Sequence, residues 1–241
     1  GHPGSEHQGR LKILGIIGGI APASTIEYYR LLVEGWRQRM PGKGYPPVII
    51  NSIDLERLLA MVGARAFGAL SDYLLDEIQR LARAGAQLAL LASNTPHAVF
   101  DTLRERSPLP LVSIVEATCT AARALALKRP GLIGTRFTMQ GSFYPEVFSR
   151  HGMTLLRPSD AEQAFIHEKY MSELVNGVFS SQTRDRILAV AERMRKELAM
   201  DGLILGGTEL PLLLRADRHG GIPLLDTTKI HVDDALARMI S

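Results

Sequence analysis

Two polar clusters, each following an apolar run, hold the residues of this chain that could do chemistry. The run Leu88–Leu91 leads into Ser93–His97 (SNTPH), and Gly202–Leu205 leads into Gly207–Glu209 (GTE), with Gly207 114 residues after Ser93. Hydroxyl and amide groups can bind a carboxylate, and imidazole or carboxyl groups can transfer protons near neutral pH. Because open α/β folds bind ligands at the carboxyl ends of their strands, we expect the two clusters to build one site.

Three ionisable side chains are candidates for acid–base chemistry. His97 lies in the first cluster, and its ordinary pKa of about 6.5 suits proton transfer, although it could equally bond to the start of a helix. Glu209 could act from the second cluster or could simply stabilise the first turn of a helix. Asp54 follows another strand end and is either a pocket residue or a turn residue. These alternatives stay open at the level of the sequence.

The elements that must position these groups alternate along the chain. Apolar, β-branched runs predict strands, and apolar residues at helical spacing predict the segments between them as helices. The predicted strands are 12–18, 47–52, the run from 88, 109–115, 130–135, the run from 202, and 222–228. The predicted helices are about 24–39, 65–84, 96–105, 116–128, 160–176, 183–200 and 228–240. Such alternation is typical of an α/β fold with parallel sheets.

Similar segments recur at a nearly constant offset, which indicates an internal duplication. Gly134 follows Gly18 by 116 residues, the two polar clusters are 114 residues apart, and Pro223 follows Pro110 by 113. We therefore predict two pseudo-symmetric lobes, each a parallel sheet flanked by helices, with the active-site cleft between them. The predicted boundaries are 11–116 for the first lobe and 117–226 for the second, with the C-terminal helix 227–240 packing back on the first.

Composition narrows the class of protein. The apolar fraction of 46% and the charged fraction of 22% are typical of a soluble globular protein, and a net charge of +3 without basic runs does not indicate nucleic-acid or membrane binding. No apolar stretch approaches the roughly 20 residues of a membrane span. The single cysteine, Cys119, favours a cytoplasmic protein and is expected to be a small buried residue rather than a relocated reactive thiol. We expect Gly1–Arg10 to be a cloning remnant or a disordered end.

The ordered motifs of the chain resemble the aspartate/glutamate racemase superfamily, in particular its aspartate-racemase branch. The resemblance covers residues 12–240 and rests on IGGIAPAST, NSID, SNTPH, GTRFTMQGSFY, LGGTELPLL and LLDTTKIHVDDAL. It implies two α/β lobes, a small amino-acid or carboxylate substrate in the cleft, no cofactor, and a homodimer. A metal is not expected, because the histidines and carboxylates of the site show no metal-ligand spacing.

Both thiols on which the chemistry of that family rests are absent. The resemblance implies one catalytic cysteine per lobe, at the positions held here by Ser93 and Gly207. A thiol loses its proton easily because its pKa is about 8.5, whereas an alcohol needs a base beside it and glycine has no side chain. Ordinary two-thiol racemisation is therefore not expected. Glycine at this edge also leaves room, so we expect the pocket to accept a bulkier substrate than aspartate.

The resemblance also implies a set of residues that bind the substrate. They are small donors at strand-to-helix turns, together with one lysine and one histidine near the cleft, although each could instead be a helix cap or a surface residue. The set is Gly19, Asn94, Thr95, Thr135, Thr138, Lys169, Thr208 and His231.

Two classes of function remain. The first is a cofactor-independent, isomerase-type enzyme acting on a small amino acid or carboxylate, with Ser93 and His97 working from one side, and Glu209 or a water molecule from the other. A lyase or hydrolase that uses Ser93 and His97 is a variant of it. The second is a ligand-binding protein that keeps the pocket without turnover. Asp54 and Gly207 complete the set of positions expected at the reacting centre.

Overall fold

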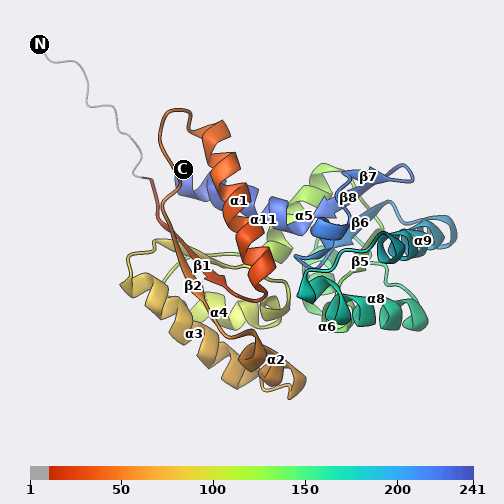
Figure 1. Ribbon diagram of the computed structural model, residues 1–241, viewed down its shortest axis with the longest axis horizontal. Coiled ribbons are helices and arrows are strands. Elements are labelled where there is room, and N and C mark those ends of the chain that lie inside the picture. The colour runs from red at the N-terminus through yellow and green to blue at the C-terminus, as the bar shows by residue number, and fades with distance from the viewer. Residues whose placement is uncertain (1–10) are drawn as a thin grey trace, which may run out of the picture.

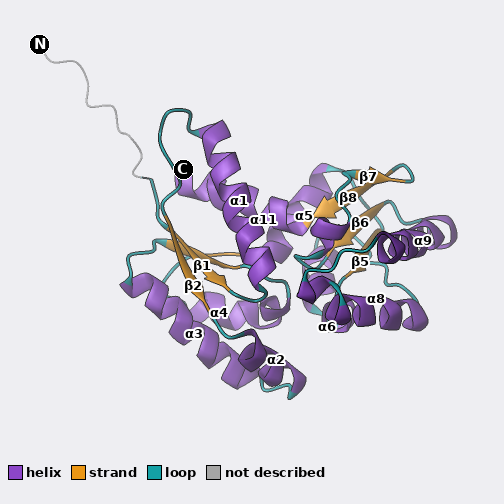
Figure 2. Ribbon diagram, viewed as in Figure 1, coloured by secondary structure: helices purple, strands orange, loops and turns teal. Residues whose placement is uncertain are grey.

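The computed structural model describes residues 11–241 and shows two α/β lobes side by side (Figure 1). The segment Gly1–Arg10 lies outside the described residues. In each lobe a central sheet is accompanied by helices (Figure 2). The predicted fold class and the two-lobe arrangement are therefore confirmed.

The sheet of the first lobe is parallel throughout and has the strand order β2-β1-β3-β4. All residues of β1 and β3 are buried, as expected for central strands covered on both faces. Its strands are β1 (Leu14–Gly18), β2 (Val48–Ser52), β3 (Leu88–Leu91) and β4 (Leu111–Val112). Its helices are α1 (Pro22–Arg39), α2 (Leu55–Gly63), α3 (Phe67–Arg83), the short 3-10 helix η1 (Thr95–Val99) and α4 (Phe100–Arg106).

The second sheet has the order β5-β6-β8-β7. Its strands are β5 (Pro130–Ile133), β6 (Gly202–Leu205), β7 (Arg218–His219) and β8 (Ile222–Asp226). The remaining helices are α5 (Ile114–Ala124), α6 (Arg136–Gln140), α7 (Phe143–Ser149), α8 (Asp160–Ser172), η2 (Leu174–Asn176), α9 (Ser181–Leu198), α10 (Leu210–Leu213) and α11 (Thr227–Ile240).

Each of the two sheets contains three neighbouring strands in the same arrangement. β1, β3 and β4 are adjacent in that order, and β5, β6 and β8 repeat the arrangement in the second lobe. β2 has no full counterpart, because only an isolated parallel bridge between Gly131 and Leu156 pairs with β5 there. The pseudo-symmetry read from the sequence is therefore present in the parallel core and reduced at the edges.

The second sheet is mixed rather than parallel, which corrects the sequence-based expectation. β7 runs antiparallel to β8. Gly220 and Gly221, which connect them, have φ values of +57° and +83°. Two consecutive residues with positive φ form the tight turn that suits a β-hairpin, and glycine adopts this conformation without steric cost.

Several element boundaries also differ from the prediction. The predicted strand 109–115 is cut to two residues, because the Ser113 hydroxyl accepts a hydrogen bond from the Glu116 N–H and starts α5 at Ile114. The helix α2 was not predicted, and neither were the short helices α6, α7 and α10. α1 begins at Pro22, two residues before the predicted start at about residue 24, since proline suits the first turn of a helix.

The chain returns to the first lobe at its C-terminal end. α11 follows β8 of the second sheet, yet its apolar residues Val232, Leu236 and Met239 belong to a buried cluster with Leu14 and Tyr28 of the first lobe. The lobes are thus joined both where α5 begins and where α11 begins. Among residues 11–241, no helix combines the length and apolarity needed to cross a membrane.

Candidate active site

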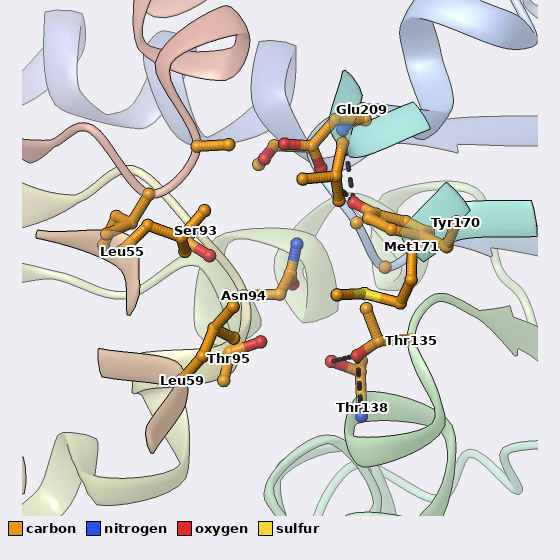
Figure 3. A pocket seen from close by; sticks show the side chains of 16 residues that line it. Leu55, Leu59, Ser93, Asn94, Thr95, Thr135, Thr138, Tyr170, Met171 and Glu209 are labelled. Atoms are coloured by element: carbon orange, nitrogen blue, oxygen red, sulfur yellow. Dashed lines mark hydrogen bonds between the residues drawn. The ribbon is translucent and has the colours of Figure 1, made fainter. Parts of the chain in front are cut away.

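A pocket lies where the strand ends of both lobes meet, and it contains both sequence clusters (Figure 3). The residues that line it follow β1, β3, β5 and β6 or come from α2, α8 and η2, and they surround about 470 Å³ of empty space, part of which is open to solvent. The lining residues are Ile20, Ala21, Leu55, Leu59, Ser93, Asn94, Thr95, Thr135, Thr138, Tyr170, Met171, Val175, Gly206, Gly207, Thr208 and Glu209.

Glu209 is held in this pocket by hydroxyl groups from both lobes. Its side chain is buried, with 4% of the residue exposed. Ser24, from α1, donates to Oε1 at 2.8 Å, and Tyr170, from α8, donates to Oε2. The Thr208 hydroxyl in turn donates to Ser24 Oγ at 2.7 Å. A buried carboxylate needs such partners, and these fix its orientation.

Tyr170 occupies the space beside Gly207. A Cβ atom built on Gly207 would lie 2.4 Å from the Tyr170 Oη and 2.5 Å from its Cε2, much closer than real atoms approach. Glycine is thus the residue that allows the phenol to reach Glu209. The expectation that this glycine leaves room for a bulkier substrate is corrected, since the tyrosine ring fills that room.

The Tyr170 ring is rigidly positioned. α8 begins with a capping box, in which the Ser159 hydroxyl and the Glu162 carboxylate each accept a backbone N–H. The ring is packed in the main apolar cluster of the second lobe. Burial, followed by the adjacent Glu209 carboxylate, raises the pKa of Tyr170 well above its ordinary value. The phenol therefore keeps its proton at neutral pH.

Asn94 presents a free donor to the pocket from the first lobe. Its Oδ1 accepts a hydrogen bond from the Tyr144 hydroxyl of α7, which fixes the amide. Its Nδ2 is buried without a hydrogen-bond partner among the described residues, although 97% of the residue is shielded. Buried amide groups are normally bonded, so this N–H group is suited to a bound ligand.

The other small donors around the pocket have longer hydrogen bonds, or none, to the residues beside them. Thr135 caps α6 by accepting the Thr138 N–H at 3.4 Å, and both side chains line the cavity. Ser93 follows β3, and none of the residues drawn in Figure 3 makes a hydrogen bond to its hydroxyl. Among the residues drawn there, no basic side chain accepts the Ser93 hydroxyl proton, and an alcohol requires such a base to act as a nucleophile or base.

The two histidines do not line this pocket, contrary to expectation. His97 Nε2 accepts the Ile114 N–H at 3.1 Å, and its ring stacks on Phe100. His231 is bonded at both nitrogens, to the Tyr28 hydroxyl at 2.6 Å and the Val112 carbonyl at 2.7 Å. Burial lowers the pKa of His97 to about 3 and that of His231 to about 4, so both are neutral. The contacts of His231 are those of a structural residue, whereas Nδ1 of His97 is buried without a hydrogen-bond partner among the described residues.

Three further candidates also lie outside the lining. Asp54 caps α2 by accepting the Glu56 N–H at 2.9 Å, which is the turn role considered from the sequence. Lys169 pairs at 3.3 Å with Glu173, the residue that follows the end of its helix. Gly19 has a φ of +81°, and a Cβ there would lie 2.5 Å from the Ser52 hydroxyl, so its conformation and close packing account for the glycine.

The sequence did not identify Tyr170, which lines the pocket, or Ser24 and Tyr144, which donate hydrogen bonds to the pocket residues Glu209 and Asn94. Tyr170 is next to the Lys169 that was chosen. The one signal for it was the glycine at a position where the resemblance implies a side chain, because a missing side chain in a packed site requires another group to fill the space.

Two other kinds of reactive group, a cysteine thiol and a metal ion, were also considered for this site. Cys119 is buried in α5, and its pKa is raised by that burial. Within the described part of the chain, no group of three or more histidine, cysteine or acidic side chains is arranged to hold a metal ion.

Comparison with known proteins defines the family. The family model for Asp/Glu/Hydantoin racemase matches residues 17–235, so this chain belongs to that family. The chain is 21% identical over 226 residues to the broad specificity amino-acid racemase RacX of Bacillus subtilis, covering 90% of this chain and 93% of the relative.

Solved structures agree on the fold. An aspartate racemase homologue from Pyrococcus horikoshii OT3 superposes with a TM-score of 0.80 at 30% identity, over 95% of this chain and 99% of that one. The aspartate racemase of Picrophilus torridus gives a TM-score of 0.77 at 20% identity, over 95% and 94% of the two chains. This second likeness shows the fold alone.

Proposed function

We propose that the protein is a cofactor-independent, isomerase-type enzyme that acts at the α-carbon of a small amino acid or carboxylate. The observation that carries the proposal is the placement of a buried carboxylate, Glu209, with Tyr170 in the same pocket as Ser93 and Asn94 (Figure 3). Two groups able to move a proton thus face hydroxyl and amide donors able to bind a carboxylate. Membership of the racemase family supports this choice of reaction.

The lining favours a substrate with one carboxylate and an apolar side chain. Glu209 is the only acidic residue among those that line the pocket. The lining contains no lysine, arginine or histidine. Leu55, Leu59, Met171 and Val175 supply an apolar wall. A second carboxylate, such as that of aspartate, would lose its hydration without gaining a cationic partner. A relative named as a broad specificity amino-acid racemase supports an amino-acid substrate.

Deuterium exchange at the α-carbon tests this proposal. The protein is incubated in heavy water with the L- and D-forms of alanine, leucine, methionine, phenylalanine, phenylglycine and aspartate, and loss of the α-proton signal is followed by NMR. We expect exchange on at least one apolar member and less on aspartate. Absence of exchange on every member would overturn the proposal.

A second candidate function is ligand binding without turnover. The observation that favours it is the Ser93 hydroxyl, at the position where the resemblance implies a thiol, because none of the residues drawn in Figure 3 forms a hydrogen bond to it. Under this alternative the same panel raises the melting temperature of the protein, and no member exchanges its α-proton. Two further expectations belong to the main proposal: a cytoplasmic location, supported by the single cysteine, and a homodimer, implied by the family resemblance.

A further inference from the structure

The starting observation is that the phenol of Tyr170 stands where a side chain of residue 207 would stand. The Cβ built on Gly207 would lie 2.4 Å from Oη and 2.7 Å from Cζ of that ring. The tyrosine comes from α8, on a different element from the strand end that carries the glycine. A proton-bearing group is thus present on the second-lobe side of the pocket, although residue 207 itself supplies none.

We propose that Tyr170, together with Glu209, is the group that moves the α-proton of the substrate, and that it does so from the second lobe only. This inference rests on the function proposed above and adds the identity and the side of the acid–base group. It assigns Tyr170 as a catalytic residue and predicts that the proton returns more often to the face from which it left than to the opposite face. Exchange at the α-carbon is therefore faster than inversion, which requires the deprotonated substrate to turn over in the pocket before it is reprotonated.

The proton balance follows from the hydrogen bond already in place. The Tyr170 hydroxyl donates to Oε2 of Glu209. As the Cα–H bond breaks, its proton passes to Tyr170 Oη, and the phenol proton passes to the Glu209 carboxylate. The electron pair of the broken bond stays on the substrate and is delocalised into its carboxylate. The reverse step returns a proton from the phenol to the α-carbon, and Glu209 is again a carboxylate.

A relay of this kind suits the environment of the phenol. Burial and the adjacent carboxylate keep the pKa of Tyr170 high, so a free phenolate does not accumulate. Glu209 is the proton acceptor, and the phenol carries the proton between it and the substrate. The Ser24 hydroxyl, which donates to Oε1 at 2.8 Å, holds the second carboxylate oxygen and keeps Oε2 directed at Tyr170.

The first lobe offers binding groups and no equivalent relay. Ser93 lies in the pocket without a hydrogen-bonded base, and His97 is outside the lining with its Nε2 engaged by the Ile114 N–H. The unpartnered Nδ2 of Asn94 can donate to the substrate carboxylate, which gains negative charge as the α-proton leaves. We assign this donor to binding of the carboxylate in the ground state and the transition state alike, so its loss raises KM more than it lowers kcat.

The test compares two buried tyrosines that differ in position. Tyr170→Phe removes the proposed relay. Tyr28→Phe is the matched control, because Tyr28 is buried and bonded to His231 but does not line the pocket. With the amino acid that exchanges fastest in the panel, we expect Tyr170→Phe to lower the exchange rate by about 100-fold or more, in the range of general acid–base catalysis. Tyr28→Phe should retain exchange. The ligand-induced rise in melting temperature should persist in Tyr170→Phe, which shows that binding is intact.

Glu209→Gln provides a second variant if Tyr170→Phe does not fold. Its amide oxygen still accepts the phenol hydrogen bond but cannot take the proton, so exchange should fall to a similar degree. Exchange that persists in folded Tyr170→Phe or Glu209→Gln would overturn this inference and leave the proposed function standing. Absence of exchange in the unaltered protein would instead overturn the proposed function, and this inference with it.

Discussion

The two strand ends that form the pocket are related by the internal duplication, yet they present different chemistry. The first supplies Ser93 and Asn94, which can donate hydrogen bonds but have no base beside them. The second supplies Glu209, and its Gly207 leaves space that the Tyr170 ring occupies. It therefore holds a carboxylate and a protonated phenol. A duplicated fold therefore does not require a duplicated mechanism. In our account one lobe binds the substrate and the other moves its proton.

The lobes nevertheless support each other in a reciprocal way. Glu209 of the second lobe is held by Ser24 of the first, and Asn94 of the first is held by Tyr144 of the second. Each key polar group thus depends on a hydroxyl across the junction. The pocket exists only with the lobes in this arrangement, which explains why neither strand end can be interpreted alone.

The largest expected effect on stability and exchange comes from introducing a side chain at residue 207. Gly207→Ala places a Cβ against the Tyr170 ring, so the ring must shift, and we expect a loss of about 1–3 kcal/mol in the free energy of unfolding. Exchange should fall about 100-fold, because the relay is displaced. Urea unfolding and deuterium exchange measure the two effects.

Two controls sharpen this prediction. Gly63→Ala adds a Cβ that meets nothing within 4 Å, so it should not destabilise the protein. Adding Tyr170→Ala to Gly207→Ala should remove most of the steric part of the loss, giving a non-additive pair. Equal destabilisation by Gly63→Ala and Gly207→Ala would contradict the packing described here.

The buried histidines should affect stability rather than the reaction. The pKa of His97 is lowered to about 3, whereas an unfolded chain has a histidine pKa of about 6.5. The unfolded state therefore binds more protons as pH falls below 6.5, and the free energy of unfolding decreases by about 1.4 kcal/mol per pH unit for this residue. His231 acts in the same direction, with its pKa lowered to about 4.

Urea unfolding between pH 6.5 and pH 5 checks this dependence. In His97→Gln the slope with pH should be smaller by about 1.1 kcal/mol per pH unit on average over this range, because the unfolded histidine is only half protonated at pH 6.5. His151→Gln, at an exposed position, serves as the control for replacing a histidine. An unaltered slope in His97→Gln would mean that His97 becomes protonated in the folded protein.

The reciprocal contacts give a pair of smaller effects that separate the two lobes. Ser24→Ala leaves one Glu209 oxygen without its donor and should lower kcat about 10-fold, as expected for one lost hydrogen bond to a charged group. Tyr144→Phe frees the Asn94 amide and should raise KM by a similar factor while kcat changes less. Initial exchange rates at varied substrate concentration distinguish these results. The same pattern in both variants would argue against a division of roles between the lobes.

Ser93→Ala should have the smallest effect on the reaction. Without a base beside it the hydroxyl is at most one hydrogen-bond donor, so exchange should stay within about 10-fold of the unaltered protein. A loss comparable to that in Tyr170→Phe would place proton transfer on the first lobe after all. Deuterium exchange on the same amino acid provides the measurement.

The sequence predicted the parts of the site that depend on local pattern. Ser93, Thr135 and Glu209 follow buried strands, and parallel strands bring their carboxyl ends to one edge, so these residues were placed in the pocket. His97 was misplaced because the turn direction after β3, which points its ring at Phe100, is not encoded in spacing. Tyr170 was missed because a ring filling the space above a distant glycine is a packing relation between elements far apart in the sequence.

The fold, too, was predicted where it depends on local sequence pattern and missed where it depends on individual turns and side chains. Alternating apolar runs identified both sheet cores, and the constant offset identified the two lobes. The hairpin of β7 and β8 was missed, although Gly220 and Gly221 are its visible signal. The shortness of β4 depends on the Ser113 side chain, which starts α5 within the run interpreted as a strand.

The most direct test of the central claim measures exchange and inversion in the same sample. The unaltered protein is incubated in heavy water with one enantiomer of its fastest-exchanging amino acid, and NMR and chiral chromatography follow deuterium uptake and the opposite enantiomer. A relay confined to the second lobe predicts that deuterium enters faster than the opposite enantiomer forms. Inversion as fast as deuterium uptake would contradict the account, because it requires a second acid–base group on the first-lobe face.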